Sequence, residues 1–154
     1  MDHFTGSHHN KLDAKGRVSV PAQYRSILKK FSHAGEDAVG APLVLRPSHR
    51  YPCIEGWPEK EFETLSAPLD AFDRFSAEHD DLSLGLFGDA CAMETDREGR
   101  IILPADMVAY ANLKDIVVFM GANKMFQIWE PEAGARRLAE ARAKIRTLTL
   151  RNGQ

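Results

Sequence analysis

The feature that most constrains the fold of this chain is an internal repeat. Residues 13–22 align without gaps on residues 96–105, and five of the ten positions are identical. Each copy continues into a helix-like segment, then a short apolar run, and then a strand-like stretch that closes on Trp57 or Trp129. Because the flanking pattern repeats in the same order, the sequence predicts two copies of one structural unit.

Each copy begins with residues that favour a tight turn. An aspartate carboxylate can accept hydrogen bonds from the backbone N–H groups just ahead of it, and a following glycine can adopt positive φ without steric cost. An arginine then begins a short strand with alternating apolar residues, so its side chain is expected at the rim of the turn. These residues are Asp13, Gly16 and Arg17 in the first copy and Asp96, Gly99 and Arg100 in the second.

Helices are predicted after these strands and between the two copies. Pro21 and Pro104 fit the first turn of a helix, where a missing N–H costs nothing. The first of these helices is expected to end before Gly35, and residues 58–88 are predicted to be helical with an interruption at Pro68. The apolar stripes that support these helices are Tyr24, Ile27, Leu28 and Phe31 in the first, and Phe62, Leu65, Leu69, Phe72 and Phe75 in the second.

The predicted elements divide the chain into four parts and indicate an α+β fold. The parts are a first unit at 7–57, a helical acidic linker at 58–89, a second unit at 90–133, and a C-terminal helix and tail at 134–154. The last helix itself is expected from Pro131 to about Leu150, with fraying from Arg151 onward. A unit of about 60 residues buries too little surface to be stable alone, so the two units are expected to pair into one pseudo-symmetric core.

The net charge of −2 hides an uneven distribution along the chain. Residues 1–33 hold six Lys or Arg against two Asp or Glu, residues 55–98 hold three against thirteen, and residues 99–154 hold nine against five. Two basic ends around an acidic middle can present a local positive surface, although solvated faces explain the pattern equally well. Charge therefore permits nucleic-acid binding without requiring it.

The order of these residues resembles the MraZ family of bacterial transcriptional regulators, which is related to AbrB. The resemblance runs from Phe4 to Trp129 and is most specific in the two Asp-x-x-Gly-Arg motifs, at 13–17 and 96–100. The residues that carry it are Phe4, Gly6, Leu12, Asp13, Lys15, Gly16, Arg17, Pro21 and Arg25, then Asp96, Gly99, Arg100 and Pro104, and finally Gly121, Ile128 and Trp129.

The resemblance implies two AbrB-like units that form a double-psi or swapped-hairpin β-barrel with flanking helices, in protomers that associate into rings. It also implies binding to short direct repeats in double-stranded DNA upstream of the operon for cell-division and cell-wall genes, including this chain's own gene. The DNA-contacting arginines that it implies are Arg17 and Arg100, and we add Lys15 and Arg97 of the same two turns as expected DNA-binding residues. Glu98 stands where the first copy has Lys15, so the two turns are expected to contribute unequally, with Arg97 as the compensating charge.

Other interpretations stay open at this point. Each arginine can be a partner of its aspartate that merely stabilises a hairpin, and the whole chain can be a ring-forming scaffold that binds protein partners through its acidic helices. An enzyme is the weakest hypothesis, because the repeat offers no convergent nucleophile, base and pocket. Salt-sensitive binding to repeated promoter boxes, absent on scrambled DNA, would separate the regulator from the scaffold.

The remaining candidate residues are interpreted as structural, and neither a metal nor another cofactor is expected. His8 and His9, with His3 nearby, are assigned to a mobile N-terminus. Cys53 and Cys91 are expected to be reduced residues of the core, and the two tryptophans to have equivalent structural places. Asp and Glu side chains of the linker are expected to form a solvated acidic face.

Hydropathy indicates that the chain is not a membrane protein. No stretch approaches the roughly 20 apolar residues that a membrane helix needs, and the first seven residues lack the basic and then apolar order of a signal peptide. The expected location is the cytoplasm, and the resemblance adds association with the nucleoid. The expected partners are therefore double-stranded DNA and further copies of the chain.

Overall fold

The computed structural model describes residues 2–151, with side chains described as far as Leu148. Within this part of the chain, one antiparallel sheet of six strands has the order β1-β7-β8-β4-β3-β5, and β2 pairs with β6 in a separate two-stranded ribbon. The strands are β1 (Ser7–Lys11), β2 (Arg17–Ser19), β3 (Pro42–Pro47), β4 (Ile54–Trp57), β5 (Cys91–Glu94), β6 (Arg100–Ile102), β7 (Ile116–Gly121) and β8 (Phe126–Trp129).

Helices flank the sheet, which confirms the predicted mixed class of α and β elements. They are α1 (Ala22–Lys30), α2 (Glu59–Glu63), the 3-10 helix η1 (Thr64–Ala71), α3 (Ala77–Phe87), α4 (Ala105–Tyr110) and α5 (Pro131–Arg151). None of the helices in the described part of the chain is both long enough and apolar enough to cross a bilayer.

The internal repeat is visible in the order of the elements, because β1-β2-α1-β3-β4 recurs as β5-β6-α4-β7-β8. The first strand of each copy pairs with the other copy: β1 lies on β7 and β5 lies on β3. The last strands of the two copies, β4 and β8, join the halves at the centre of the sheet. Neither copy therefore completes its sheet alone, as the small size of each unit predicts.

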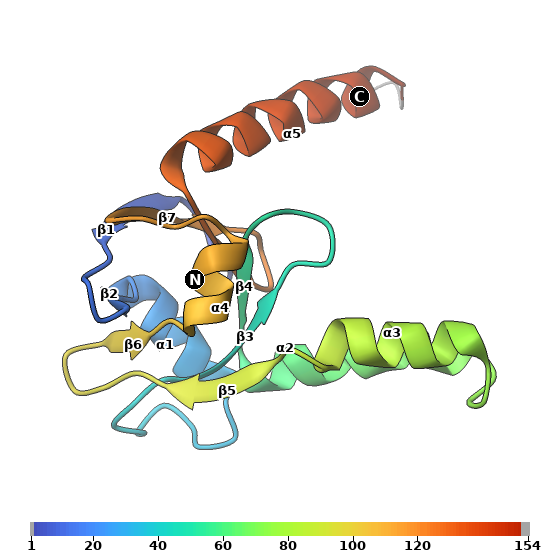
Figure 1. Cartoon of the computed structure of the whole chain (residues 1–154), viewed down its shortest axis with the longest axis horizontal. Coiled ribbons are helices and arrows are strands. Elements are labelled where there is room, and N and C mark those ends of the chain that lie inside the picture. Colours follow the sequence, from blue (N-terminus) through green and yellow to red (C-terminus); the bar gives the residue numbers. More distant parts are fainter. Residues whose placement is uncertain (1, 152–154) are drawn as a thin grey trace.

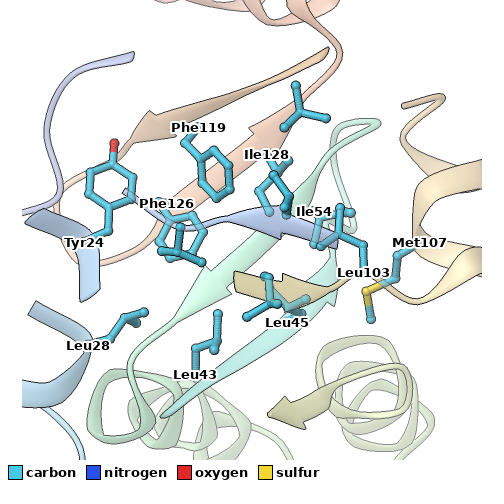
Figure 2. Packing of buried hydrophobic residues seen from close by; sticks show 14 of the residues in the cluster. Tyr24, Leu28, Leu43, Leu45, Ile54, Leu103, Met107, Phe119, Phe126 and Ile128 are labelled. Carbon is cyan, nitrogen blue, oxygen red and sulfur yellow. The ribbon is translucent and has the colours of Figure 1, made fainter. Parts of the chain in front are cut away.

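The core lies between the sheet and the helices α1 and α4, and both repeats contribute to it (Figure 2). Successive strand residues point to opposite faces, so alternate apolar side chains reach the core. The fully buried ones include Leu43 and Leu45 of β3, Ile54 of β4, Phe119 of β7, and Phe126 and Ile128 of β8. Tyr24 and Leu28 of α1 cover one side of this cluster and Met107 of α4 the other.

The first helix matches its predicted stripe. Tyr24, Ile27 and Leu28 of α1 are buried, and the helix ends at Lys30, before Gly35. The structure differs from the prediction in one detail. Pro21 and Pro104 were expected in the first turn, but they are the N-cap residues of α1 and α4. Proline suits this place as well, since its extended backbone leads into the helix and a cap needs no N–H of its own.

Residues 59–87, which comprise α2, η1 and α3, form an acidic arm that projects away from the sheet (Figure 1). The predicted interruption at Pro68 falls inside η1. The predicted apolar stripe is covered only in its inner part, because Leu69 is buried whereas Phe72 is 39% and Phe75 is 89% exposed. The reason is that the arm leaves the sheet, so its outer part has no second layer to cover these side chains.

A buried ion pair anchors the arm. Arg46 of β3 and Glu55 of β4 face each other in register, with Nη1 and Oε1 2.6 Å apart. Arg46 also donates from Nε to the Leu86 carbonyl at 3.1 Å and from Nη2 to the Gly85 carbonyl at 3.0 Å, which fixes the end of α3. Loss of either charge would leave the other buried without an opposite charge, at a cost of roughly 3–5 kcal/mol.

The last helix extends as predicted. Helix α5 packs near its start, where Leu138 lies against a small cluster that includes Val118 and Trp129, and its distal part extends past the sheet (Figure 1). Ile145 and Leu148, expected as part of its apolar set, are exposed. Arg151 still belongs to the helix, and the rest of the tail that was expected to fray lies outside the described residues.

Candidate nucleic-acid interface

The first turn has the structure that its residues predict. Asp13 Oδ1 accepts hydrogen bonds from the backbone N–H groups of Lys15 and Arg17, both at 2.9 Å, and Oδ2 accepts from Arg17 Nε at 2.7 Å. Gly16 has a φ of +83° and donates its N–H to the Asp13 carbonyl. The backbone N–H of Arg17, followed by its side chain, holds the pKa of the Asp13 carboxyl below its ordinary value of 3.8.

The second turn repeats this structure with one added contact. Asp96 Oδ1 accepts from the backbone N–H groups of Glu98 and Arg100 at 2.9 Å, and Oδ2 accepts from Arg100 Nε at 3.0 Å. Glu98 Oε2 also accepts from Arg100 Nη2 at 2.9 Å. The N–H of Arg100, followed by its side chain, lowers the pKa of Asp96, and the hydrogen bond to Asp96 raises the pKa of Arg100.

Hydrogen bonds between the repeats hold the two turns at the two ends of the antiparallel β2–β6 ribbon. The Gly16 carbonyl accepts the N–H of Leu103 at 2.8 Å, and the Gly99 carbonyl accepts the N–H of Val20 at 2.9 Å. Both turns lie at the left of Figure 1, on the side opposite to the direction in which the acidic arm and α5 extend. The molecule therefore has one end formed by the turns and another formed by its helical projections.

The β2–β6 ribbon places both arginines on one face. Arg17 pairs with Ile102 and Arg100 with Ser19, while the central pair of the ribbon is buried. Alternation then puts Arg17, Ser19, Arg100 and Ile102 together on the outer face. The Cα atoms of the two arginines lie on a diagonal of the ribbon, about 8 Å apart by ideal strand geometry.

The structure brings the residues proposed from the sequence to this one end. The side chains of Arg17 and Arg100 are 37% and 36% exposed, and Lys15 and Arg97 are exposed. Among the described residues, the side chains of Lys15 and Arg97 have no hydrogen-bond or ion-pair partner. Four basic groups are thus available to an external anion beside the two structured turns, and their role in binding DNA stays a prediction.

Two further basic residues of this end were not predicted as site residues. Arg25 of α1 donates from Nη1 to the Glu98 carbonyl of the second turn, 73 residues away in sequence. Lys114 lines a shallow groove beside the first turn, together with Lys15 and Gly16. The sequence carried two signals for Arg25, because it lies off the apolar stripe of α1 and belongs to the residues that carry the resemblance. Neither signal says what the side chain meets.

Residues interpreted as structural are placed as follows. His8 and His9 lie on β1, so their assignment to a mobile N-terminus is wrong; pairing with β7 fixes them. No three or more His, Cys, Asp or Glu side chains in the described part of the chain are grouped so as to hold a metal ion. Cys53 is buried, and this burial raises the pKa of its thiol to about 12, whereas Cys91 is half-buried.

The two tryptophans occupy equivalent places, as predicted. Trp57 ends β4 and Trp129 ends β8, and each donates its indole N–H to the residue two positions earlier, Glu55 or Gln127. Trp129 is buried in the cluster under α5, and Trp57 packs against Phe62 of the arm. Both indoles therefore anchor helices on the outer face of the sheet.

The family described as "MraZ protein, putative antitoxin-like" matches residues 3–84 and 86–150. The chain belongs to the MraZ family. A protein of Gluconacetobacter diazotrophicus named "Transcriptional regulator MraZ" is 54% identical over 150 residues, which cover 97% of this chain and 92% of that protein. Proteins with the same name from Gluconobacter oxydans and Rickettsia bellii are 49% and 39% identical, over 96% and 93% of this chain and 88% and 92% of their own lengths.

Proposed function

We propose that this member of the MraZ family is a sequence-specific DNA-binding transcriptional regulator that presents its β2–β6 ribbon to double-stranded DNA. The observation that carries the proposal is the placement of Arg17 and Arg100 on one outer face, each oriented by an aspartate of its own turn. The names of the relatives support the same function. Such a regulator acts in the cytoplasm, on the nucleoid.

The ribbon has suitable dimensions and chemistry for this role. A major groove of about 12 Å admits a two-stranded β-ribbon, and an arginine fork can bind phosphate oxygens or make a bidentate contact to guanine. In each turn the aspartate holds the arginine through Nε. In Arg17 this leaves Nη1 and Nη2 without a protein acceptor among the described residues, available to a base edge or a phosphate.

The proposed targets are short direct repeats upstream of the operon for cell-division and cell-wall genes, which includes the gene for this chain. One ribbon contacts few phosphates and therefore binds weakly. Several ribbons in one assembly that engage successive repeats would raise the affinity through effective concentration. The proposal therefore includes self-association into a ring.

Two exposed surfaces of opposite charge support this association. The acidic arm carries exposed Phe75 and Leu84, and the distal part of α5 carries exposed Ile145 and Leu148. The arm holds Glu59, Glu61, Glu63, Asp70, Asp73, Glu78, Asp80 and Asp81, and α5 holds Arg136, Arg137, Arg142, Lys144 and Arg146. Contact between the arm of one copy and α5 of the next would be head-to-tail, which generates a ring when the rotation closes.

The exchange of β1 and β5 between the repeats also supports the more specific fold that we propose, an AbrB-like swapped-hairpin barrel. In this proposal the units 7–57 and 90–133 each contribute one turn to the DNA interface. The segment 58–89 and the C-terminal part 134–154 contribute the surfaces of assembly. The division matches the two ends of the molecule, with turns on one side and helical projections on the other (Figure 1).

Titration of a labelled duplex tests the proposed function. The probe is the DNA directly upstream of the gene that encodes this chain, called the upstream duplex, and the control is a scrambled duplex of the same composition. We expect saturable binding to the upstream duplex, with log K falling against log[salt] by a slope near −0.9 for each phosphate neutralised. Light scattering of the same sample is expected to report several protomers.

The scaffold hypothesis predicts a different result for the same titration. A protein that uses its exposed arm only to bind other proteins would form the ring but show no preference for the upstream duplex and no salt dependence. A monomer at micromolar concentration would remove the multivalency on which the affinity of the regulator depends.

A further inference from the structure

We propose that Arg25, which belongs to the first repeat, is a DNA-contacting residue of the second turn and binds the phosphate backbone beside Arg100. This inference rests on the proposed function and deepens it. It adds to the interface a residue from outside the two Asp-x-x-Gly-Arg motifs, and it makes the second turn a composite of both repeats.

Arg25 reaches from α1 to the tip of the second turn. A Cβ built on Gly99 would lie 1.4 Å from Arg25 Nη1 and 2.5 Å from its Cζ, so the guanidinium occupies the space that a side chain at position 99 would need. Its Nη1 donates to the Glu98 carbonyl at 3.5 Å, which is long for an N–H···O hydrogen bond. Within the described residues the other guanidinium N–H groups have no protein acceptor, so they are available to an external one.

The first turn has no such cover. Val108 of α4 holds the position equivalent to Arg25, and a shallow groove of about 300 Å³ lies there, lined by Val108, Gly16, Lys15 and Lys114 among others. Gly16 is accordingly half-exposed, whereas Gly99 is buried. The two repeats therefore have the same backbone turn and different neighbours at its tip.

The charges explain why the second turn gains from an added cation. The motif at 13–17 holds two basic residues against one acidic residue, and the motif at 96–100 holds two against two. Glu98, which replaces a lysine, also binds Arg100 Nη2 and neutralises part of that guanidinium. With Arg25 the second turn again has one more basic than acidic side chain, which is what a surface facing a phosphate backbone requires.

Phosphate is the ligand chemistry that fits this position. A guanidinium presents several donors in a planar fork that matches two phosphate oxygens, and it keeps its charge at every physiological pH. Arg25 begins on α1 and lies against the tip of the second turn, at the end of the ribbon and not among the outward residues of its strands. It is therefore placed to meet the wall of a groove that the ribbon enters, where the backbone lies, and not a base edge.

The variant Arg25→Gln tests this assignment, because glutamine keeps a polar side chain at this position of α1 and lacks the charge. For binding to the upstream duplex, the slope of log K against log[salt] is expected to become shallower by about 0.9 for each engaged turn. Arg25→Lys keeps the charge and is expected to keep the slope. Arg50→Gln, the same change at an exposed arginine in the loop between β3 and β4, is the matched control and should leave slope and affinity unchanged.

A residue that only covers Gly99 would behave differently. In that case Arg25→Gln would alter thermal stability while its salt slope stayed equal to that of the parent protein, and this outcome would overturn the proposal. Circular dichroism and light scattering of each variant identify changes in folding and assembly. The parent titration decides the proposed function separately: if the parent does not bind the upstream duplex, both proposals fall.

A second measurement on the unaltered protein covers the case in which Arg25→Gln does not fold. Phenylglyoxal modifies accessible arginines, and mass spectrometry reports the extent at each site with and without the upstream duplex. Protection of Arg25 together with Arg17, and equal modification of Arg50 in both samples, supports the proposal. Equal modification of Arg25 with and without a duplex that protects Arg17 would refute it.

Discussion

The two turns are built alike and charged differently. In each, one aspartate carboxylate accepts two backbone N–H groups and the arginine Nε, at 2.7 Å in the first turn and 3.0 Å in the second. Arg17 has no protein acceptor for Nη1 or Nη2 among the described residues, whereas Glu98 engages Arg100 Nη2. The comparison shows that one set of residues determines the shape of a turn and another determines its charge.

The largest expected effect is a loss of DNA affinity on replacing Arg17 or Arg100, and this loss is expected to differ between the two arginines. Arg17→Ala is expected to weaken binding to the upstream duplex by roughly 5- to 150-fold per engaged site, the range for a base-contacting arginine. Arg100→Ala is expected to cost less, because Asp96 and Glu98 already neutralise that guanidinium in the free protein. Parallel titrations of both variants measure the difference.

Equal losses from the two variants would show that Glu98 does not limit the second turn. An Arg17→Ala protein that assembles normally and binds as tightly as the parent would instead reduce Arg17 to a partner of Asp13 that stabilises the turn. If that variant no longer assembles, Lys15→Ala is the cleaner comparison, since Lys15 has an exposed side chain without a protein partner in the described part of the chain.

The glycines provide the second comparison. Gly16→Ala and Gly99→Ala are each expected to lower the free energy of unfolding by about 1–2 kcal/mol, because both positions have φ near +80°. A Cβ at position 16 would meet the Leu103 carbonyl oxygen at 3.2 Å, whereas one at position 99 would displace the guanidinium of Arg25. Only Gly99→Ala is therefore expected to change the salt slope of DNA binding. Chemical denaturation and titration of the two variants measure these effects, and identical slopes would contradict the role of Arg25.

A smaller effect on DNA affinity is expected from the outer face of the ribbon. Ile102 stands where the first repeat has Ser19, and it is 63% exposed. An apolar side chain between two arginines can contact a thymine methyl group. Replacing thymine by uracil in the upstream duplex is expected to weaken the parent about fourfold for each methyl contacted, from roughly 0.8 kcal/mol per buried carbon. The variant Ile102→Ser is expected to bind both duplexes equally. If Ile102→Ser discriminates between them as the parent does, Ile102 does not contact a methyl group.

The smallest difference expected between the turns is in acid titration. The pKa values of Asp13 and Asp96 both lie below the ordinary value of 3.8 in the folded chain. Their stabilisation is therefore fully present above the ordinary value and is lost as the pH falls through the lowered values. Carboxyl NMR titrations should show two similar midpoints below 3.8, with no change in either turn near neutral pH. A midpoint at or above 3.8 for one aspartate would mean that its turn is not formed in solution.

Much of the candidate site could be predicted from the sequence because its bonds are local. Each turn closes within five residues, from aspartate to arginine, through hydrogen bonds between positions two to four apart. The repeat of that motif also predicted the repeated order of strands and helices, and the stripe of α1 predicted its buried face. Local spacing alone determines such contacts, so no knowledge of the rest of the chain was needed.

The tertiary structure decided the contacts between residues that are distant in sequence. The position of Arg25 on Gly99, the pairing of Arg46 with Glu55, and the exchange of β1 and β5 between the repeats have no local pattern. The tertiary structure also decided that the outer part of the arm is exposed. Apolar spacing on a helix indicates which side chains share a face but not whether another layer covers them. The sequence by itself therefore determined the turns and their arginines, and packing across the two repeats determined which further charges stand beside them.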